Sequence, residues 1–153
     1  MKLAVLGGTG FLGRHVCESL ARRNLAATTI SRSPDQEFLK HYAPTITGLL
    51  AGSDGAREAL LAADTIIHLG HVSRPGSEPD AAMTELERNI APMVELVRMI
   101  SVNKPGVRII YTSTGGQIYG PGHRSPIPEM VAPAPTTSYA LGKQLVEQIL
   151  DYY

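Results

Sequence analysis

The segment 7–13 (GGTGFLG) near the N-terminus carries the strongest chemical signal in the chain. It follows a short apolar run and precedes a helical pattern, so its glycines join a strand to a helix. Gly7 permits a tight turn, Gly10 lets the backbone approach a pyrophosphate closely, and Gly13 lets the helix pack on the strand. The helix start, with Phe11 and Leu12, offers free N–H groups at the positive end of the helix dipole. This arrangement predicts a turn that binds a dinucleotide. The simpler alternative is an ordinary glycine-rich turn without a ligand.

Tyr139 and Lys143 form a second candidate pair, because residues four positions apart share one face of a helix. The ammonium can then lie beside the phenol and favour its phenolate form. A tyrosine in that form can exchange a proton with a substrate near neutral pH. The same spacing also fits a tyrosine stacked over a lysine stem on a solvated face. The pair therefore becomes informative only together with the glycine segment.

Short apolar runs alternate with helical patterns along the whole chain, and glycine and proline separate them. The apolar runs predict strands over 2–6, 26–30, 45–50, 65–69 and 107–112. The helical patterns predict helices over 11–23, 33–42, 56–62, 80–102 and 138–153. Parallel strands need crossover connections, which the helices supply. We therefore expect an α/β fold with a Rossmann-type doubly wound parallel sheet and the strand order 3-2-1-4-5.

Two of these elements carry further expectations. Pro92 should kink the long helix over 80–102, because proline cannot donate the helical hydrogen bond. The run 107–112 (VRIIYT) is apolar on both faces, which is typical of a parallel strand that is covered on both sides. The predicted strand order nevertheless puts this run at one edge of the sheet.

The composition excludes several classes of protein. The chain has 153 residues, with 14 Lys+Arg against 14 Asp+Glu, and the basic residues form no run. A formal net charge of zero without basic clusters argues against nucleic-acid and membrane-surface partners. No stretch approaches the ~18 apolar residues of a membrane helix, and glycines interrupt the N-terminal apolar run before it reaches signal-peptide length. We expect a cytoplasmic protein of one domain.

The single cysteine and the five histidines give no sign of a disulfide or a metal site. Cys17 has no second cysteine to pair with, which suits a reducing compartment, and we expect it to be a small buried apolar residue. The histidines lack the spacing of metal ligands, so structural or surface roles are expected for them.

Further segments complete a recognisable pattern: His68-Leu69 at the end of the fourth predicted strand, Asn89 in the long helix, the hydroxyl-rich loop 113–120 (STGGQIYG) and Pro128-Glu129. Together with the glycine segment and the Tyr-Lys pair, they resemble the extended branch of the short-chain dehydrogenase/reductase superfamily. This branch contains the NAD-dependent nucleotide-sugar epimerases, dehydratases and reductases. The resemblance covers essentially the whole chain.

The resemblance implies catalytic roles for four residues. Tyr139 would take or give a hydroxyl proton while hydride moves between a sugar carbon and the nicotinamide. Lys143 would hold the cofactor ribose and favour the phenolate. Thr114 would hydrogen-bond the reacting oxygen; Ser113 competes for this role, but Thr114 stands 25 residues before Tyr139, which fits the family better. Either hydroxyl could instead cap the end of the strand.

The resemblance also extends the cofactor site beyond the glycine segment. It assigns Leu69 and Gly70, at the end of the fourth predicted strand, to this site. It also assigns Asn89, for which a helix residue facing solvent is the alternative. Tyr139 and Lys143 would contact the cofactor as well.

Ser31 and Arg32 stand at the end of the second strand, where NAD-binding members carry an acidic residue for the ribose hydroxyls. A guanidinium beside a small hydroxyl suits a 2′-phosphate instead. The sequence therefore favours NADP and leaves NAD as the alternative.

The activity that the resemblance implies is that of an NAD(P)-dependent nucleotide-sugar epimerase, with transient hydride transfer at one sugar carbon. Gly115-Gly116 stand where the family's 4,6-dehydratases carry an Asp-Glu pair, so a dehydratase is disfavoured. An NADPH-dependent nucleotide 4-keto-sugar reductase is the alternative, which a preference for NADP would favour. A non-catalytic dinucleotide-binding module is the alternative from another class. The substrate itself does not follow from the sequence.

Members of this family are much longer, and their second half supplies the last strands and most of the nucleotide-sugar pocket. Residues 1–153 would then be the cofactor-binding domain with the C-terminal substrate domain absent, either as a fragment or as a truncated gene product. The chain alone should have little turnover and an open apolar edge at 107–112. In the family, helices like 80–102 and 138–153 form a dimer interface, so we expect a homodimer through them.

Overall fold

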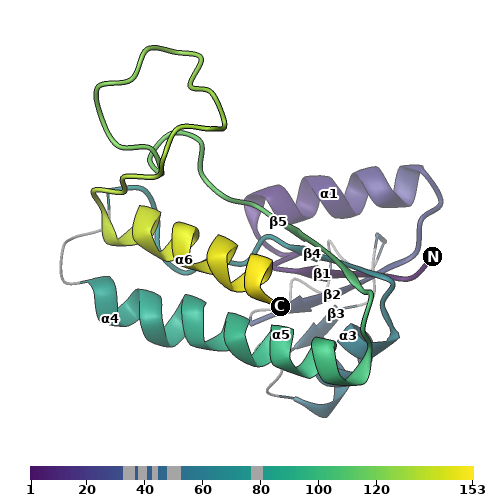
Figure 1. Cartoon of the computed structure of the whole chain (residues 1–153). Coiled ribbons are helices and arrows are strands. Elements are labelled where there is room, and N and C mark those ends of the chain that lie inside the picture. The colour runs from purple at the N-terminus through teal and green to yellow at the C-terminus, as the bar shows by residue number, and fades with distance from the viewer. Residues whose placement is uncertain (33–36, 38–40, 43–44, 48–52, 77–80) are drawn as a thin grey trace. The chain divides into compact units, whose positions relative to one another are not determined.

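An apolar strand of four residues, β1 (Leu3–Leu6), lies at the centre of a five-stranded parallel sheet in the computed structural model of the chain (Figure 1). All four of its side chains are buried, as expected for a strand that has a neighbour on each side and is covered on both faces. The other strands are β2 (Ala27–Ser31), β3 (Thr45–Thr47), β4 (Thr65–His68) and β5 (Arg108–Tyr111). Their order is β3-β2-β1-β4-β5, and every neighbouring pair is parallel. The prediction of a parallel doubly wound sheet is confirmed.

The structure describes residues 1–32, 37, 41–42, 45–47, 53–76 and 81–153. The described residues belong to two compact units, which interleave along the sequence. The first unit contains Met1–Gly70 and Glu95–Thr112, and the second contains His71–Val94 and Ser113–Tyr153. The whole sheet lies in the first unit.

The register of the sheet brings three strand ends level with one another. Leu6, the last residue of β1, pairs with Ile30 of β2 and with His68 of β4. The segments that follow these strands therefore begin side by side at the carboxyl end of the sheet. The connection from β1 leads to β2 on one side, whereas the connection from β4 leads to β5 on the other side of β1. The carboxyl end of the sheet is therefore a topological switch point here.

The helices of the first unit are α1 (Phe11–Arg22), α3 (Asp54–Ala62) and the larger part of α5 (Ala91–Asn103). Because crossovers between parallel strands are right-handed, α1 and this part of α5 lie on opposite faces of the sheet (Figure 1). Local chemistry fixes the helix ends. Asn24 adopts a left-handed φ of 55° just after α1, and the Ser53 side chain accepts a hydrogen bond from the Ala56 amide at the start of α3.

Strand β5 differs from the expectation of a strand covered on both faces. Its residues alternate between exposed and half-buried, and the Ile110 side chain is 48% exposed. It pairs with β4 and is the last strand in the sheet order. The apolar sequence of β5 therefore reflects its place in a parallel sheet and not complete burial. The expectation that both faces of this strand are covered was wrong. The edge position expected from the strand order is observed.

The second unit consists mainly of helices. It contains α4 (Ala82–Glu85), a π-helical turn (Leu86–Ile90), the first residues of α5 and the C-terminal helix α6 (Ser138–Tyr152). Helix α6 packs against α4 and against the π-helical turn. The Thr137 side chain caps α6 by accepting a hydrogen bond from the Ala140 amide at 3.2 Å.

The long helix predicted over 80–102 is interrupted at the π-helical turn, in which the Ala91 amide bonds to the carbonyl of Leu86. Pro92 follows directly and has no amide hydrogen to donate. A wider helical turn thus lies directly before Pro92, and the kink that the sequence predicts at the proline itself stays a prediction.

Some sequence predictions fall outside the described residues. These are most of the helix expected over 33–42, the second half of the strand expected over 45–50 and the start of the helix expected at residue 80. Among the described residues, no helix has both the length and the apolar character that a membrane span requires.

Candidate active site

The glycine turn after β1 is shaped by close contacts between backbone segments of the first unit. Gly7 has a φ of 83°, which side-chain-bearing residues rarely adopt, and a Cβ atom there would lie 2.8 Å from the amide nitrogen of Gly70. A Cβ atom at Gly13 would collide with the carbonyl oxygen of Gly7. Hydrogen bonds from the Gly7 amide to the Ile30 carbonyl and from the Gly10 amide to the Gly7 carbonyl complete the turn. The roles predicted for Gly7 and Gly13 as sites of a tight turn and close packing therefore agree with the geometry.

The start of α1 is left open by this turn. Gly10 is the N-cap residue and has no side chain to accept from the first-turn amides, and no acidic residue lies in that turn. Phe11 and Leu12 follow it with mostly exposed side chains. The first amides of a helix have no intrahelical acceptor and carry the positive end of the dipole, so this terminus can receive an anionic group.

The end of β2 is tied to the glycine turn through Ser31. The Ser31 hydroxyl oxygen accepts from the amide of Thr9 at 3.3 Å and from the Thr9 hydroxyl at 3.0 Å. The Nε of Arg14 donates to the carbonyl of Thr9 at 3.1 Å. Ser31, predicted as a cofactor residue, is thus buried and holds the turn in place, whereas its neighbour Arg32 is exposed.

Leu69 and Gly70, the predicted cofactor residues after β4, also lie beside the turn. The Leu69 amide donates to the Leu6 carbonyl at 2.9 Å, and Gly70 is the backbone neighbour of Gly7. The first unit therefore brings together the predicted residues of the glycine segment, Ser31, Leu69 and Gly70. The remaining predicted residues belong to the second unit.

In the second unit, Tyr139 and Lys143 share one face of α6, as their spacing predicted. The Lys143 ammonium nitrogen lies 5.7 Å from the centre of the Tyr139 ring. Lys143 is only 3% exposed, so the alternative of a solvated surface pair is excluded. Burial lowers the pKa of Lys143 from its ordinary 10.5 to about 8, while the negative charges of Glu85 and Glu147 act in the opposite direction.

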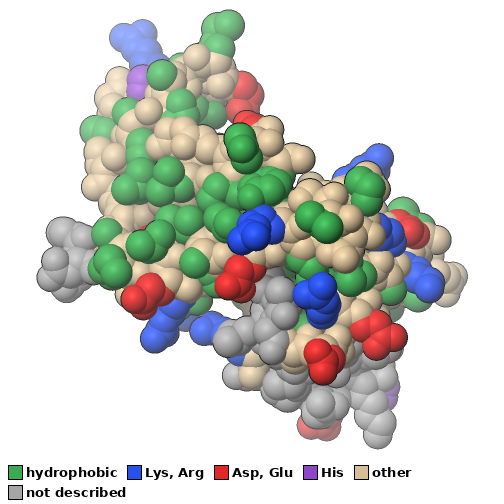
Figure 2. All heavy atoms as spheres, turned by 60° about the horizontal axis from the view of Figure 1, so that its bottom comes forward, with side chains coloured by type: hydrophobic (Ala, Val, Ile, Leu, Met, Phe, Trp, Pro, Cys, Tyr) green, Lys and Arg blue, Asp and Glu red, His purple; other side chains and the backbone are tan. Residues whose placement is uncertain are grey.

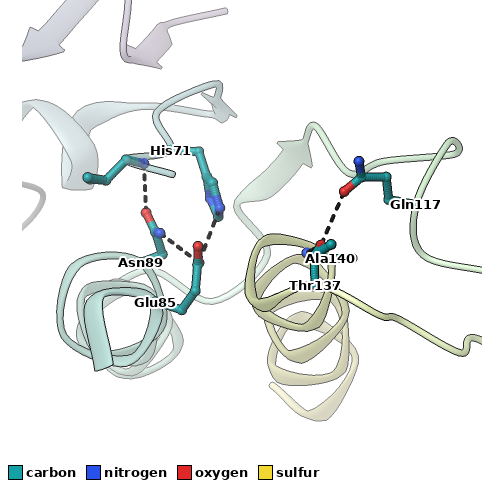
Figure 3. A network of polar contacts seen from close by, with 7 residues as sticks. His71, Glu85, Asn89, Gln117, Thr137 and Ala140 are labelled. Carbon is teal, nitrogen blue, oxygen red and sulfur yellow. Dashed lines mark hydrogen bonds and ion pairs between the residues drawn. The ribbon is translucent and has the colours of Figure 1, made fainter. Parts of the chain in front are cut away.

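A polar network connects the end of α4 with the loop after β4 (Figure 3). The side chain of Asn89 accepts from the Val72 amide at 3.0 Å and donates to Oε2 of Glu85 at 2.8 Å. Nε2 of His71 lies 3.3 Å from the same Glu85 oxygen. Asn89, predicted as a cofactor residue, is therefore buried and joins two segments of its own unit, so the alternative of a residue facing solvent is wrong.

The His71 ring also contacts Tyr139. The two ring centres are 5.3 Å apart and the ring planes are nearly perpendicular, at 85°. This edge-to-face arrangement is a favourable one for aromatic rings. The second unit thus brings Asn89, Tyr139 and Lys143 into one cluster, with His71 and Glu85 between them.

The two hydroxyl candidates lie in the loop that follows β5. Thr114 is half-buried, and Ser113 is exposed. Farther along this loop, Gln117 accepts a hydrogen bond from the Thr137 hydroxyl at 3.1 Å, and the same Thr137 oxygen caps α6 (Figure 3). This bond connects the loop that carries Ser113 and Thr114 to the start of the helix that carries Tyr139.

Sequence reasoning missed four residues of these two clusters: Gly8, His71, Glu85 and Gly142. A Cβ atom at Gly8 would lie 2.8 Å from Cβ of Thr29, and a Cβ atom at Gly142 would collide with the carboxylate of Glu85. Two signals were present in the sequence. Glu85 stands four residues before Asn89 and so on the same helical face, and Gly142 is an isolated glycine inside a helical pattern.

The residues of the first unit fit a dinucleotide. The space that a Cβ atom would fill at Gly7 and Gly13 is taken by backbone, and the uncapped start of α1 directs amides outward from a glycine-lined turn. This is the chemistry that a pyrophosphate requires. The fold and this turn define the class of dinucleotide-binding α/β proteins.

The chain belongs to the NAD dependent epimerase/dehydratase family, whose model matches residues 3–153. The UDP-glucose 4-epimerase of Neisseria meningitidis serogroup B is 29% identical to it over 168 residues, an alignment that covers 97% of this chain and 47% of that protein. The chain thus spans about half the length of the curated relatives that it matches.

Solved structures with low sequence identity share the fold. The UDP-glucose 4-epimerase of Thermus thermophilus, in complex with NAD, superimposes with a TM-score of 0.84 at 23% identity, over 100% of this chain and 50% of that one. The UDP-glucose 4-epimerase of Brucella ovis, also in complex with NAD, has a TM-score of 0.85 at 21% identity, over 99% of this chain and 47% of that one.

The lowered pKa of Lys143 predicts an unusual dependence of stability on pH. Between pH 8 and 10.5 the unfolded chain holds the lysine proton and the folded chain has released it, so the free energy of unfolding should rise with pH. The rise should be roughly 3 kcal/mol relative to Lys143→Met, which has no proton to release. Urea unfolding of both proteins across this range, followed by circular dichroism, measures the difference. A difference that stays constant with pH would contradict the prediction.

Proposed function

We propose that this chain is the cofactor-binding part of an NAD(P)-dependent nucleotide-sugar epimerase. The observation that carries the proposal is the buried Lys143 beside the Tyr139 ring, in a chain whose glycine turn fits a pyrophosphate. Relatives named UDP-glucose 4-epimerase support this choice of activity and the nucleotide sugar as the substrate class.

Each candidate residue would have a separate role in the reaction. Tyr139 would exchange a proton with a sugar hydroxyl, and Lys143 would supply positive charge beside the phenol and bind the cofactor ribose. Thr114, with Ser113 as the alternative, would hydrogen-bond the reacting oxygen. The glycine turn and the start of α1 would hold the cofactor, which would supply reversible hydride transfer at the sugar carbon.

Arg32 supports NADP as the preferred cofactor. Arg32 is exposed directly after β2, and the preceding residue, Ser31, is bonded through its hydroxyl to the glycine turn. A 2′-phosphate on the adenosine ribose would suit this cation. A preference for NADP would favour the second candidate function, a nucleotide 4-keto-sugar reductase, because net reduction consumes an exchangeable NADPH.

Calorimetric titration of the chain with NADP⁺ and with NAD⁺ tests both the binding and the preference. Wild-type protein should bind both and favour NADP⁺. Arg32→Asp should weaken NADP⁺ binding by about tenfold or more, because a charge-assisted hydrogen bond is lost and a repulsive charge is added. Arg57→Asp, which makes the same change at an exposed position on α3, is the control and should have little effect. An unchanged preference in Arg32→Asp would remove the argument for NADP.

The catalytic roles are tested in a complete catalytic unit that includes residues 1–153, with UDP-glucose as the first substrate to assay. Tyr139→Phe should abolish turnover and leave cofactor binding nearly intact, because only the proton-transfer group is removed. Thr114→Val should lower turnover more than Ser113→Ala does, and the opposite ranking would exchange these two roles. Cofactor binding without turnover of any nucleotide sugar would instead favour a non-catalytic dinucleotide-binding module.

We also propose that the protein forms a homodimer through the helices of the second unit. Met83 and Leu86, near the end of α4, and Leu141 on α6 are apolar but 60%, 47% and 43% exposed. Figure 2 shows hydrophobic side chains gathered on the face that it presents. Apolar faces of this kind on packed helices are typical of a surface that a partner covers.

Light scattering at micromolar concentration should find a dimer. Leu86→Glu should convert it to a monomer, because the carboxylate would have to be buried in the interface. Met130→Glu makes the same change at a 91% exposed residue of the loop before α6 and should leave the dimer intact. A wild-type monomer would refute the proposal.

A further inference from the structure

Glu85 is a buried acid for which the proposed reaction has no role. It is 2% exposed, and its Oε2 accepts from Asn89 Nδ2 at 2.8 Å and lies 3.3 Å from Nε2 of His71. Its other oxygen, Oε1, has no hydrogen-bond partner among the described residues. Removal of a carboxylate from water is costly unless positive charge lies nearby. The groups around Glu85 should therefore explain why an acid is retained there.

The charged and titratable groups that face Glu85 come from two segments. His71 lies on the loop after β4, and α6 contributes Lys143, on which the charges of Glu85 and Glu147 both act. Tyr139, on the same helix, contacts the His71 ring. On its own helical segment, Glu85 contacts the uncharged Asn89. The two groups that can be positively charged here, His71 and Lys143, both lie against Tyr139.

Helix α6 makes room for this carboxylate. Gly142 is buried beside Lys143, and a Cβ atom there would collide with the carboxylate of Glu85. Glycine in the interior of a helix lowers its stability relative to alanine. The carboxylate of Glu85 therefore explains why a glycine stands at position 142. Glu85, at the end of α4, and Gly142, on α6, depend on each other for their packing.

We propose that Glu85 is a positioning residue for the Tyr139–Lys143 pair. Its carboxylate holds the His71 ring against Tyr139 and supplies the negative charge that keeps the buried Lys143 ammonium charged. The part of this inference that concerns catalysis by Tyr139 rests on the proposed function, whereas the electrostatic part concerns the chain alone. Burial lowers the pKa of Lys143. Of the two carboxylates that raise this pKa, Glu85 has the larger effect. Without Glu85, the lysine should lose its proton at a still lower pH.

Nuclear magnetic resonance of the cofactor-free chain tests this directly. The chain has four lysines, so ¹³C labelling of their side chains gives few signals, and Lys143→Arg assigns the signal of Lys143. Glu85→Gln keeps the shape of the side chain and removes its charge. It should lower the measured pKa of Lys143 by about one unit or more, the usual effect of losing a close opposite charge. A merely structural role for Glu85 would leave this pKa unchanged in a folded variant.

Glu147→Gln is the matched control, because it removes a second negative charge that acts on Lys143 from the same helix. It should lower the pKa of Lys143 by less than Glu85→Gln does. An unchanged pKa in Glu85→Gln, or an equal decrease in both variants, would overturn the proposal.

Gly142→Ala keeps the test valid if Glu85→Gln does not fold. Alanine favours the helix, and its Cβ atom would displace the flexible end of the Glu85 side chain without removing its charge. The pKa of Lys143 should fall, and the nuclear Overhauser contacts between the His71 and Tyr139 rings should weaken. A Gly142→Ala chain with an unchanged pKa and unchanged ring contacts would overturn the proposal.

The outcomes separate this inference from the proposed function. A chain that binds NADP⁺ or NAD⁺ but shows no effect of Glu85→Gln refutes the role of Glu85 and leaves the proposed function standing. A chain that binds neither cofactor but shows the expected decrease refutes the proposed function and leaves the electrostatic role of Glu85 standing.

Discussion

Close backbone approach at the end of β1 is the constraint on which the first unit depends. Gly7 lies against Gly70, which follows the neighbouring strand β4, and Gly13 lies against the carbonyl of Gly7. A side chain at either position would separate α1 from β1, or β1 from the segment after β4. The same contacts leave the amides at the start of α1 without a side-chain cap. The packing requirement and the capacity to bind an anion therefore arise from the same few residues.

The second unit depends on charge that is removed from water. Lys143 and Glu85 are both almost fully buried, and the negative charge of Glu85 favours the charged form of Lys143. Asn89 donates to the carboxylate oxygen that lies 3.3 Å from Nε2 of His71, and Gly142 provides the space for this carboxylate. A tyrosine beside such a cluster experiences a fixed arrangement of charges, which is the property that proton transfer requires.

Local patterns predicted most of the fold because they act over a few residues. The apolar runs indicated the strands, and the alternation with helices indicated a parallel sheet, since parallel neighbours need crossovers. The ends of α1 and α3 also depend on local chemistry, namely the left-handed backbone of Asn24 and the side-chain cap of Ser53. The sequence did not predict the π-helical turn before Pro92, and the apolar pattern of β5 did not predict its exposure, which follows from its place at the end of the strand order.

The glycine turn, the helical face shared by Tyr139 and Lys143 and the family resemblance could all be predicted from the amino-acid sequence, because each rests on residue types at short fixed spacings. Only the tertiary structure decided that Lys143 is buried, that Ser31 bonds to Thr9, and that Asn89 bonds to Glu85. These properties depend on segments far apart in the chain, whose approach no local pattern specifies. His71 and Glu85 are the clearest case, since they meet only when the loop after β4 packs against α4 and α6.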